Sequence, residues 1–211
     1  MEKNKKQMLL TTALCLLPIL AGLLVYDRLP ETVATHFGFN GEPNGWSSRP
    51  MAVFGLPAMM AFFNLVLHFG LNSDPKKANI DPKMRAIAVW TMPALAVICY
   101  GMTLANALGV DTKIHKVIPA IIGVMFILIG NYMPKTKRSY TTGIKLPWTL
   151  NSDENWNRTH RMAGFLWVVC GAAFLLCTLL QLWNLWLFLL LIGAMVLLPM
   201  VYSYLLYRKG I

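Results

Sequence analysis

The chain has 211 residues, of which 56% are hydrophobic and only 13% are charged, and its formal net charge is +10. A soluble domain carries about twice this charged fraction, so the composition excludes an ordinary soluble enzyme or binding domain. Short strands of alternating polarity, which a membrane barrel requires, are absent from the sequence. The composition therefore predicts an integral membrane protein built from helices.

Six apolar runs define the predicted architecture. Each is about 20 residues long, which is enough for a helix to cross the roughly 30 Å hydrocarbon layer. The predicted fold class is an all-α polytopic membrane helix bundle. We expect a two-span unit at residues 1–83 with an outer loop at 27–50, and a four-span unit at 84–211 with a cytoplasmic loop at 134–161. The runs are approximately Met8–Tyr26, Met51–Leu71, Met84–Leu108, Ile114–Met133, Met162–Leu182 and Leu185–Tyr207.

The distribution of Lys and Arg predicts the orientation, because cations near helix ends are retained on the cytoplasmic side. If the N-terminus lies inside, 15 of the 19 Lys and Arg residues fall in inner segments and only 4 in outer segments. Both termini are therefore predicted to be cytoplasmic. The same asymmetry explains the pI of about 9.6. Membrane lipid is the expected partner of these cations, and we predict no direct binding of nucleic acid.

Catalytic and metal-binding signatures are missing from the sequence. It contains no H-E-x-x-H, no G-x-S-x-G and no P-loop pattern. No acidic residue lies in the interior of a predicted span, which disfavours an ion-coupled transporter. The cysteines lack metal-ligand spacing and the histidines fall in four separate segments, so we predict no enzyme activity, no cofactor and no metal site. These residues are Cys15, Cys99, Cys170 and Cys177, and His36, His68, His115 and His160.

The outer loop at 27–50 combines turn-forming and aromatic residues. The run Gly41–Gly45 is typical of consecutive turns rather than of a helix or a strand. Trp46, Phe37 and Phe39 are expected to anchor the loop at the headgroup level, where aromatic residues are enriched. Together with His36, the same rings could instead form the lip of a ligand-binding site. Both interpretations stay open.

The segment Asn131–Gly164 is the longest polar break in the second half of the chain. It contains a cationic cluster at 134–138, which attraction to lipid headgroups explains. The run 141–150 has a Gly turn and a Pro-Trp pair, and we expect it to lie along the membrane interface. Asn-Ser-Asp-Glu at 151–154 supplies a helix N-cap followed by acids. The helix that begins there is expected to run directly into the fifth span.

Several motifs in these two loops resemble those of a known protein family. The inner series resembles the signature of the SdpI family, which comprises multi-spanning immunity proteins of Gram-positive bacteria. The outer series is similar to the amino-terminal domain of unknown function that many of these proteins share. The inner motifs are Gly130-Asn131, Thr142–Leu150, Asp153–Trp156 and His160-Arg161, and the outer ones are Leu29–Glu31, His36-Phe37 and Gly41–Trp46.

The resemblance implies a function and a set of partners. The family protects its producer, at the bacterial plasma membrane, against a secreted antimicrobial peptide toxin. In some members the protein is also a toxin-sensing receptor that holds a cytoplasmic transcriptional repressor at the membrane. The family usually has Arg two residues before its Pro-Trp pair, whereas this chain has Lys145, which keeps the charge but loses the bidentate fork of a guanidinium.

The resemblance also names candidate residues on each side of the membrane. A toxin arriving from outside would meet the outer loop, while a cytoplasmic regulator would meet the inner one. Three alternatives stay open: a small permease or exporter, a membrane enzyme that uses the inner loop, and an inner motif that only locks the fourth and fifth spans together, with its tryptophans as interfacial anchors. The outer candidates are His36, Phe37, Gly41, Pro43 and Trp46, and the cytoplasmic ones are Asn131, Gly143, Lys145, Pro147, Trp148, Thr149, Trp156, His160 and Arg161.

Overall fold

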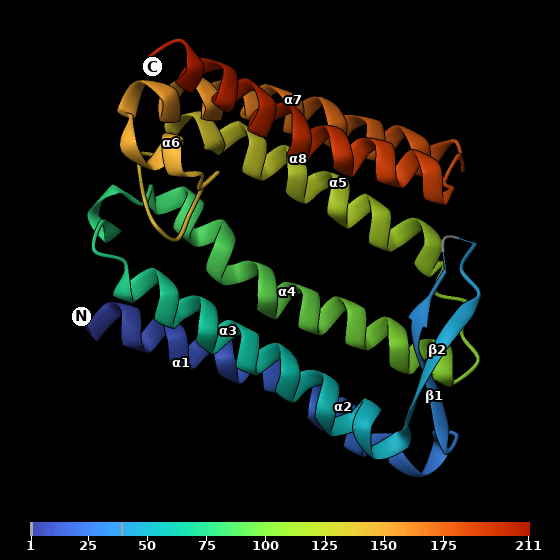
Figure 1. Ribbon diagram of the computed structural model, residues 1–211. Coiled ribbons are helices and arrows are strands. Elements are labelled where there is room, and N and C mark those ends of the chain that lie inside the picture. Colours follow the sequence, from blue (N-terminus) through green and yellow to red (C-terminus); the bar gives the residue numbers. More distant parts are fainter. Residues whose placement is uncertain (1, 39) are drawn as a thin grey trace. The chain divides into compact units, whose positions relative to one another are not determined.

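The computed structural model describes residues 2–38 and 40–211. Within these ranges, six helical segments are long and apolar enough to cross a membrane, so the predicted fold class is confirmed (Figure 1). The segments are α1 (Glu2–Leu16) continued by α2 (Pro18–Leu24), a π-helical turn (Met51–Gly55) continued by α3 (Leu56–Ser73), α4 (Pro82–Ala107), α5 (Ile114–Tyr132), α7 (Asp153–Leu179) and α8 (Leu185–Arg208).

The chain divides into two compact units that do not follow the order of the sequence. The first unit comprises Met1–Phe69 and Ala88–Ile118, and the second comprises Gly70–Ile87 and Pro119–Ile211. Helices α3, α4 and α5 therefore each contribute residues to both units. The division expected from the sequence, between residues 83 and 84, stays a prediction.

The first unit is held by two apolar clusters and by polar contacts between helices. Leu29, Val53, Tyr100 and Leu104 form the cluster near the hairpin, and Cys15, Ala61 and Ala96 form the second. Elsewhere in the unit, α1 and α3 meet through buried side chains. The Asn64 amide donates to Thr11 Oγ1 at 3.1 Å and to Thr12 Oγ1 at 2.9 Å, and Thr11 Oγ1 lies 2.9 Å from His68 Nε2.

The outer loop is a β-hairpin, which differs from the expected run of turns. Strands β1 (Thr32–Phe37) and β2 (Pro43–Ser48) pair antiparallel, with Ala34 opposite Trp46. The prediction that Gly41–Gly45 forms only turns was wrong, because the turn ends at Glu42 and β2 begins at Pro43. A strand-initial Pro is tolerated at the edge of a two-stranded ribbon, where its missing N–H removes no necessary ladder bond.

In the second unit, α5 and α7 pack backbone to backbone through two pairs of glycines. A Cβ atom on Gly123 would lie 2.9 Å from the Gly171 carbonyl oxygen, and one on Gly171 would lie 2.7 Å from the Gly123 oxygen. Gly130 and Gly164 repeat this relation two turns away, at 2.8 and 2.7 Å. Small residues allow such close approach of membrane helices. This packing fixes the ends of α5 and α7, between which the inner loop lies.

Candidate functional site

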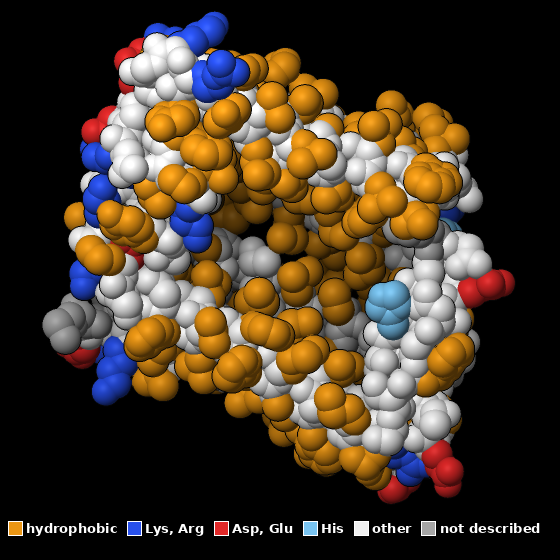
Figure 2. All heavy atoms as spheres, in the orientation of Figure 1, with side chains coloured by type: hydrophobic (Ala, Val, Ile, Leu, Met, Phe, Trp, Pro, Cys, Tyr) orange, Lys and Arg blue, Asp and Glu red, His pale blue; other side chains and the backbone are white. Residues whose placement is uncertain are grey.

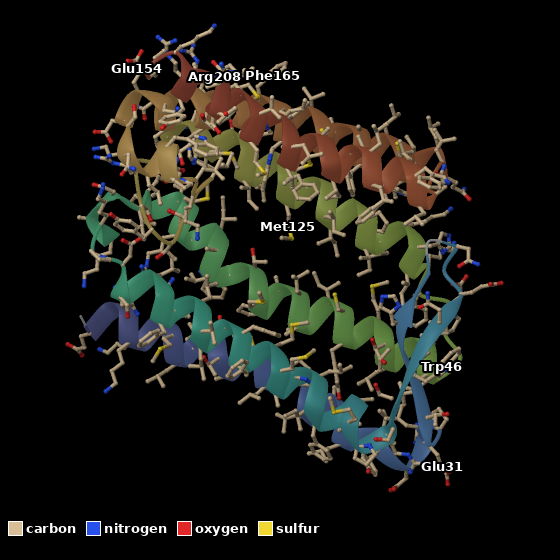
Figure 3. The ribbon with its side chains drawn as sticks, viewed as in Figure 1. Glu31, Trp46, Met125, Glu154, Phe165 and Arg208 are labelled. Carbon is tan, nitrogen blue, oxygen red and sulfur yellow. The ribbon has the colours of Figure 1, made fainter. Side chains whose placement is uncertain are left out.

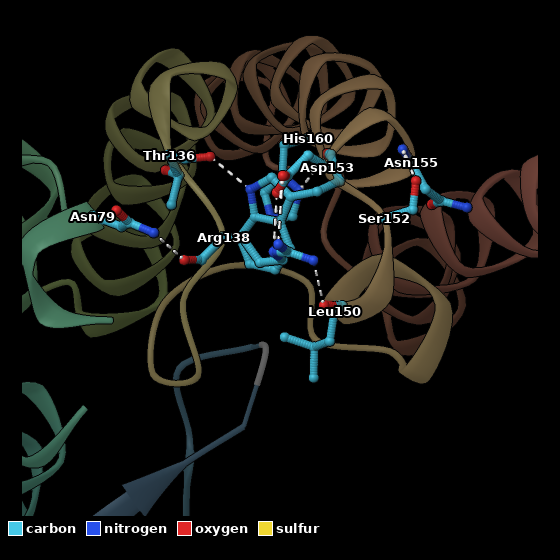
Figure 4. Close-up of polar contacts among 9 residues, drawn as sticks. Asn79, Thr136, Arg138, Leu150, Ser152, Asp153, Asn155 and His160 are labelled. Carbon is cyan, nitrogen blue, oxygen red and sulfur yellow. Dashed lines mark hydrogen bonds and ion pairs between the residues drawn. The ribbon is translucent and has the colours of Figure 1, made fainter. Parts of the chain in front are cut away.

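The inner loop leaves α5 through a 3-10 turn, Met133–Lys135, and returns through α6 (Pro147–Asn151) to α7. The first turns of α7 hold the start of the loop, because Trp156 Nε1 donates to the Thr136 carbonyl at 2.6 Å (Figure 4). Only 1% of the Trp156 surface is exposed. Trp156 is thus a core residue of the loop, and the alternative that made it an interfacial anchor was wrong for this residue.

A glycine turn packs against two rings at the centre of the loop. The Ile144 N–H donates to His160 Nε2 at 2.8 Å, so Nδ1 carries the proton and donates to the Trp156 carbonyl, also at 2.8 Å. The rings of His160 and Trp156 stack with centroids 4.0 Å apart. Gly143 has φ +100°, and a Cβ there would lie 2.5 Å from His160 Nε2. The position therefore requires glycine both for its backbone conformation and for space.

The short helix α6 is fixed at its first turn by Thr149. Pro147 occupies the first turn, where its missing N–H is not needed. The Leu146 N–H donates to Thr149 Oγ1 at 2.9 Å, and the same hydroxyl donates to the Ile144 carbonyl at 2.8 Å. Thr149 is completely buried. Its hydroxyl thus joins the glycine turn to α6.

Trp148 docks α6 onto α8. Its Nε1 donates to Ser203 Oγ at 2.8 Å, and its ring stacks on Tyr207 with centroids 5.9 Å apart. The Asn155 amide donates to the Ser203 carbonyl at 3.0 Å, next to the same point. Ser152, which precedes α7, accepts from the Asn155 N–H, which confirms the predicted N-cap. The inner loop therefore joins α5, α7 and α8.

A buried carboxylate ties the inner loop to the segment between α3 and α4. Asp74 Oδ2 accepts from Ser139 Oγ at 2.6 Å and from the N–H groups of Tyr140 and Thr141 at 3.0 and 2.9 Å. Its other oxygen accepts from the Lys76 N–H at 2.7 Å. Burial alone would raise the pKa of Asp74, but these hydrogen bonds stabilise the carboxylate more and leave the pKa below its ordinary value.

Arg138 connects the same segments from the other side of the loop (Figure 4). Its carbonyl accepts from the Asn79 amide at 2.8 Å, and its guanidinium donates to the Leu150 carbonyl at 2.9 Å. The guanidinium also forms an ion pair with Asp153, with 2.9 Å between Nε and Oδ1. Because Asp153 is largely exposed, the ion pair itself contributes little stability. The two carbonyl contacts define the position of Arg138.

The outer hairpin exposes several of its predicted site residues. His36 and Trp46 are exposed, with 60% of the Trp46 surface accessible (Figure 3). Gly41 has φ +84°, and a Cβ there would lie 2.7 Å from Nδ1 of His115, the second residue of α5. Phe37 is half-buried and Pro43 is exposed. The hairpin thus exposes His36, Pro43 and Trp46, whereas Gly41 lies close to His115 of α5. Phe39, the further predicted anchor, lies outside the described residues.

The structure brings some of the cytoplasmic candidates together and leaves others apart. Thr149, Trp156 and His160 form the buried centre of the inner loop, the exposed Gly143 packs against the two rings, and Trp148 joins that loop to α8. The remaining candidates, Asn131, Lys145, Pro147 and Arg161, are exposed. Within residues 2–38 and 40–211, no three His, Cys, Asp or Glu side chains are grouped so as to hold a metal ion.

Sequence reasoning missed three residues that organise this site, Asp74, Ser139 and Ser203. Asp74 stands before a proline in a polar loop, a pattern that equally describes an ordinary turn. A carboxylate with three convergent donors is visible only once the two loops are placed together. Ser203 lies in an apolar span, and a hydroxyl there is the one signal that could have suggested an interhelical partner for the Trp148 indole.

Two protein-family matches were found, one in each half of the chain. Residues 13–61 match DUF1648, a domain of unknown function, and residues 135–203 match the SdpI/YfhL protein family. The protein "Immunity protein SdpI" of Bacillus subtilis (strain 168) is 27% identical over 167 residues, which are 79% of this chain and 78% of that protein. An uncharacterized protein of Archaeoglobus fulgidus is 39% identical over 64 residues, which are 28% of this chain and 35% of that protein. No solved structure matches the chain.

Six spans and a folded loop between α5 and α7 define a multi-pass helical protein of the plasma membrane. Within that class, the chain is similar to the SdpI/YfhL protein family over residues 135–203 and to DUF1648 over residues 13–61. The resemblance predicted from the run Thr142–Leu150 and from the outer run Gly41–Trp46 is therefore confirmed.

Proposed function

We propose that the protein is a membrane immunity protein that protects its producer against a secreted antimicrobial peptide toxin. The observation that carries the proposal is the similarity to the Bacillus subtilis immunity protein, which extends over 79% of this chain and 78% of that protein. The buried centre of the inner loop adds support, because it is built by residues of the family motif such as Thr149 and Trp156. This role requires no catalytic step.

We further propose that the toxin first meets the outer hairpin. On the orientation predicted from the Lys and Arg distribution, the hairpin lies outside. It presents an exposed indole at Trp46 and an exposed imidazole at His36, and both rings can contact a membrane-active peptide as it reaches the bilayer surface. Gly41 and Phe37 would then act by shaping the hairpin rather than by touching the peptide.

The inner loop is proposed as the place where a toxin-sensing signal would be read. Its rigid centre supports exposed residues, Lys145, Pro147 and Arg161, that a cytoplasmic transcriptional repressor could contact. Lys145 is held near the glycine turn, since its Nζ donates to the Thr141 carbonyl at 3.3 Å. A receptor that sequesters a repressor would need the inner loop to change when toxin binds outside.

Deletion of the gene is the direct test of the immunity function. Cells that lack the protein are expected to become sensitive to culture supernatant of sibling cells or to a member of a panel of secreted peptide toxins, and the intact gene is expected to restore protection. Sensitivity that stays unchanged across the whole panel would contradict the proposal. Altered uptake or efflux of a small solute, without altered toxin sensitivity, would favour a permease instead.

Reporter fusions test the orientation on which the division of roles depends. Reporters fused after Thr149 are expected to behave as cytoplasmic and reporters fused after Gly41 as external, because 15 of the 19 cations then lie inside. Activity of an alkaline phosphatase reporter and of a cytoplasmic reporter at each point measures this. The opposite pattern would refute the orientation and exchange the roles of the two loops.

Replacement of Trp148 by Ala is expected to impair protection while the protein stays in the membrane. The change removes the hydrogen bond to Ser203 and the stacking on Tyr207, which join α6 to α8. Loss of a half-buried indole with these contacts costs about 3 kcal/mol. Survival under toxin challenge, compared at equal protein abundance, measures the effect. Trp186→Ala is the matched control. The Trp186 indole lies on α8, the helix that Trp148 contacts, but it is 78% exposed. This variant should retain protection.

A further inference from the structure

A cationic pocket lies at the end of the second unit, beside the inner loop. It has a volume of about 800 Å³ and is walled by the segment after α3, by the end of α5 with the start of the loop, and by the first turns of α7. Lys and Arg side chains gather at this end of the helices, whereas apolar side chains cover the helices themselves (Figure 2). Its lining residues include Lys76, Asn79, Lys135, Lys137, Arg138 and Asp153.

The charges in the pocket are unbalanced. Asp153 is the one acidic residue in the lining, and it is already paired with Arg138. Among the described residues, Lys76, Lys135 and Lys137 have no carboxylate within ion-pair distance. Three ammonium groups around one cavity repel one another and gain from an anion held between them. The pocket is therefore complementary to a compact group with more than one acceptor oxygen.

The walls of the pocket are fixed before any ligand arrives. Asn79 is bonded to the Arg138 carbonyl, and the Thr136 carbonyl accepts from Trp156 at 2.6 Å. Two of the lysines also lie against rings: Lys76 Nζ is 5.3 Å from the Tyr140 centroid and Lys135 Nζ is 4.9 Å from the Tyr132 centroid. Contact with a ring face restrains an ammonium group without neutralising it. The lysine side chains would therefore lose little conformational freedom when a ligand binds in the pocket.

The surroundings of the pocket indicate where the anion comes from. The pocket is lined by Pro134 and Lys135, directly after the end of α5, and on the predicted orientation this end of the helix meets the cytoplasmic surface of the bilayer. Val124, Leu128 and Tyr132 recur every four residues on α5 and so share a face that leads to Lys135. Val124 and Leu128 are 46% and 43% exposed, so an acyl chain could lie along this face while its headgroup enters the pocket.

We propose that this pocket binds the phosphate group of an anionic phospholipid headgroup. The phosphate lies among Lys76, Lys135 and Lys137, and the Asn157 amide in the pocket wall is available as a further donor. Bound lipid joins the segment after α3 to the inner loop, in addition to the protein contacts through Asp74 and Arg138. The proposal is independent of the immunity function, because it concerns lipid alone.

The test measures lipid binding by the full-length protein in detergent by native mass spectrometry. Phosphatidylglycerol and phosphatidylcholine are titrated in parallel against wild type and against the triple variant Lys76→Gln, Lys135→Gln, Lys137→Gln. The variant is expected to bind phosphatidylglycerol about tenfold more weakly, since each cation near an anionic headgroup contributes measurably to affinity. Its binding of phosphatidylcholine is expected to stay unchanged, which also reports that it is folded.

A second triple variant removes the same number of charges elsewhere on the predicted cytoplasmic side. Lys5→Gln, Arg208→Gln and Lys209→Gln change exposed residues away from the pocket, and the expected loss of phosphatidylglycerol binding is less than about twofold. An equal loss of phosphatidylglycerol binding in both triple variants would overturn the proposal and leave only a general attraction to anionic lipid. If the pocket triple does not fold, Lys137→Gln alone replaces it, with an expected loss of about threefold.

Inorganic phosphate, added without phosphatidylglycerol, distinguishes a lipid from a soluble ligand. Phosphate alone is expected neither to raise the thermal unfolding temperature of wild type nor to displace bound phosphatidylglycerol, because it lacks the acyl chains that hold lipid near the pocket. Stabilisation of wild type by phosphate, lost in the pocket triple, would overturn the assignment to lipid and indicate a soluble phosphate compound instead.

Discussion

The variant with both Gly123→Ala and Gly130→Ala is expected to unfold at a much lower temperature than wild type, because each new methyl group would enter the backbone of α7. At Gly130 the added Cβ would lie 2.8 Å from the Gly164 carbonyl oxygen and 2.9 Å from the Val168 nitrogen. Backbone atoms cannot turn away as a side chain can, so α5 and α7 must separate. Overpacking of this kind costs about 1–3 kcal/mol at each site.

The two costs are expected to add, since the sites are two helical turns, about 10 Å, apart. Alanine favours the helix over glycine by about 0.5–1 kcal/mol, which offsets only part of the cost. The net loss corresponds to a decrease of about 5 °C or more in the midpoint of thermal unfolding in detergent. Less protein should also accumulate in the membrane, and the inner loop should lose its fixed base.

Gly193→Ala is the matched control for this experiment. It lies in α8 of the same unit, and nothing lies within 4 Å of the Cβ that the change would add. Its unfolding temperature is expected to equal or slightly exceed that of wild type, because only the helix propensity changes. If the double variant behaved like Gly193→Ala, the close approach of α5 and α7 would be refuted.

The sequence predicted the membrane helices well because their signal is local. A run of about 20 apolar residues satisfies its own backbone groups as a helix, whatever its neighbours are. The same holds for the N-cap at Ser152, whose hydroxyl oxygen accepts from the Asn155 N–H only three residues away. In the fifth span, Asp153–Leu179, the helix starts before the apolar run because this cap and the buried residues Asn155 and Trp156 extend it.

The hairpin and the centre of the inner loop were less accessible to sequence reasoning, because both depend on residues far apart in the chain. The strand β2 (Pro43–Ser48) contains Pro, Asn and Gly, which disfavour strands, and pairing with β1 (Thr32–Phe37) overrides that preference. The motif at Gly143 was recognised by resemblance, but its physical reason, a glycine against the rings of Trp156 and His160, is visible only in three dimensions.

The carboxylate of Asp74 holds the start of the inner loop, and this residue is only 4% exposed. Asp74→Asn is expected to loosen the inner loop and to lower the unfolding free energy by about 2–3 kcal/mol. Hydrogen bonds to a charged group contribute about 1.5–3 kcal/mol, and a buried donor that loses its acceptor adds a further cost. The amide that replaces the carboxylate has only one acceptor oxygen, yet Ser139, Tyr140, Thr141 and Lys76 all donate to this side chain.

Limited proteolysis and thermal unfolding together measure this effect. In Asp74→Asn, cleavage within residues 136–146 should become several times faster, because the donors of Ser139 and Thr141 no longer hold that stretch. Asp81→Asn is the matched control, since Asp81 accepts from the N–H groups of Lys83 and Met84 at the start of α4. Asn and Asp serve about equally well at a helix N-terminus, so this control should change the stability by less than about 0.5 kcal/mol.

The pH dependence gives an independent check on the same carboxylate. The pKa of Asp74 is lowered in the folded protein, so its stabilising contribution is present above the ordinary carboxyl pKa of about 4 and is lost as the pH falls through the lowered value. Wild type should therefore lose more stability than Asp74→Asn between about pH 5 and pH 3, and the two unfolding curves should converge at the acid end. Parallel curves over that range would show that Asp74 stabilises the inner loop without its charge.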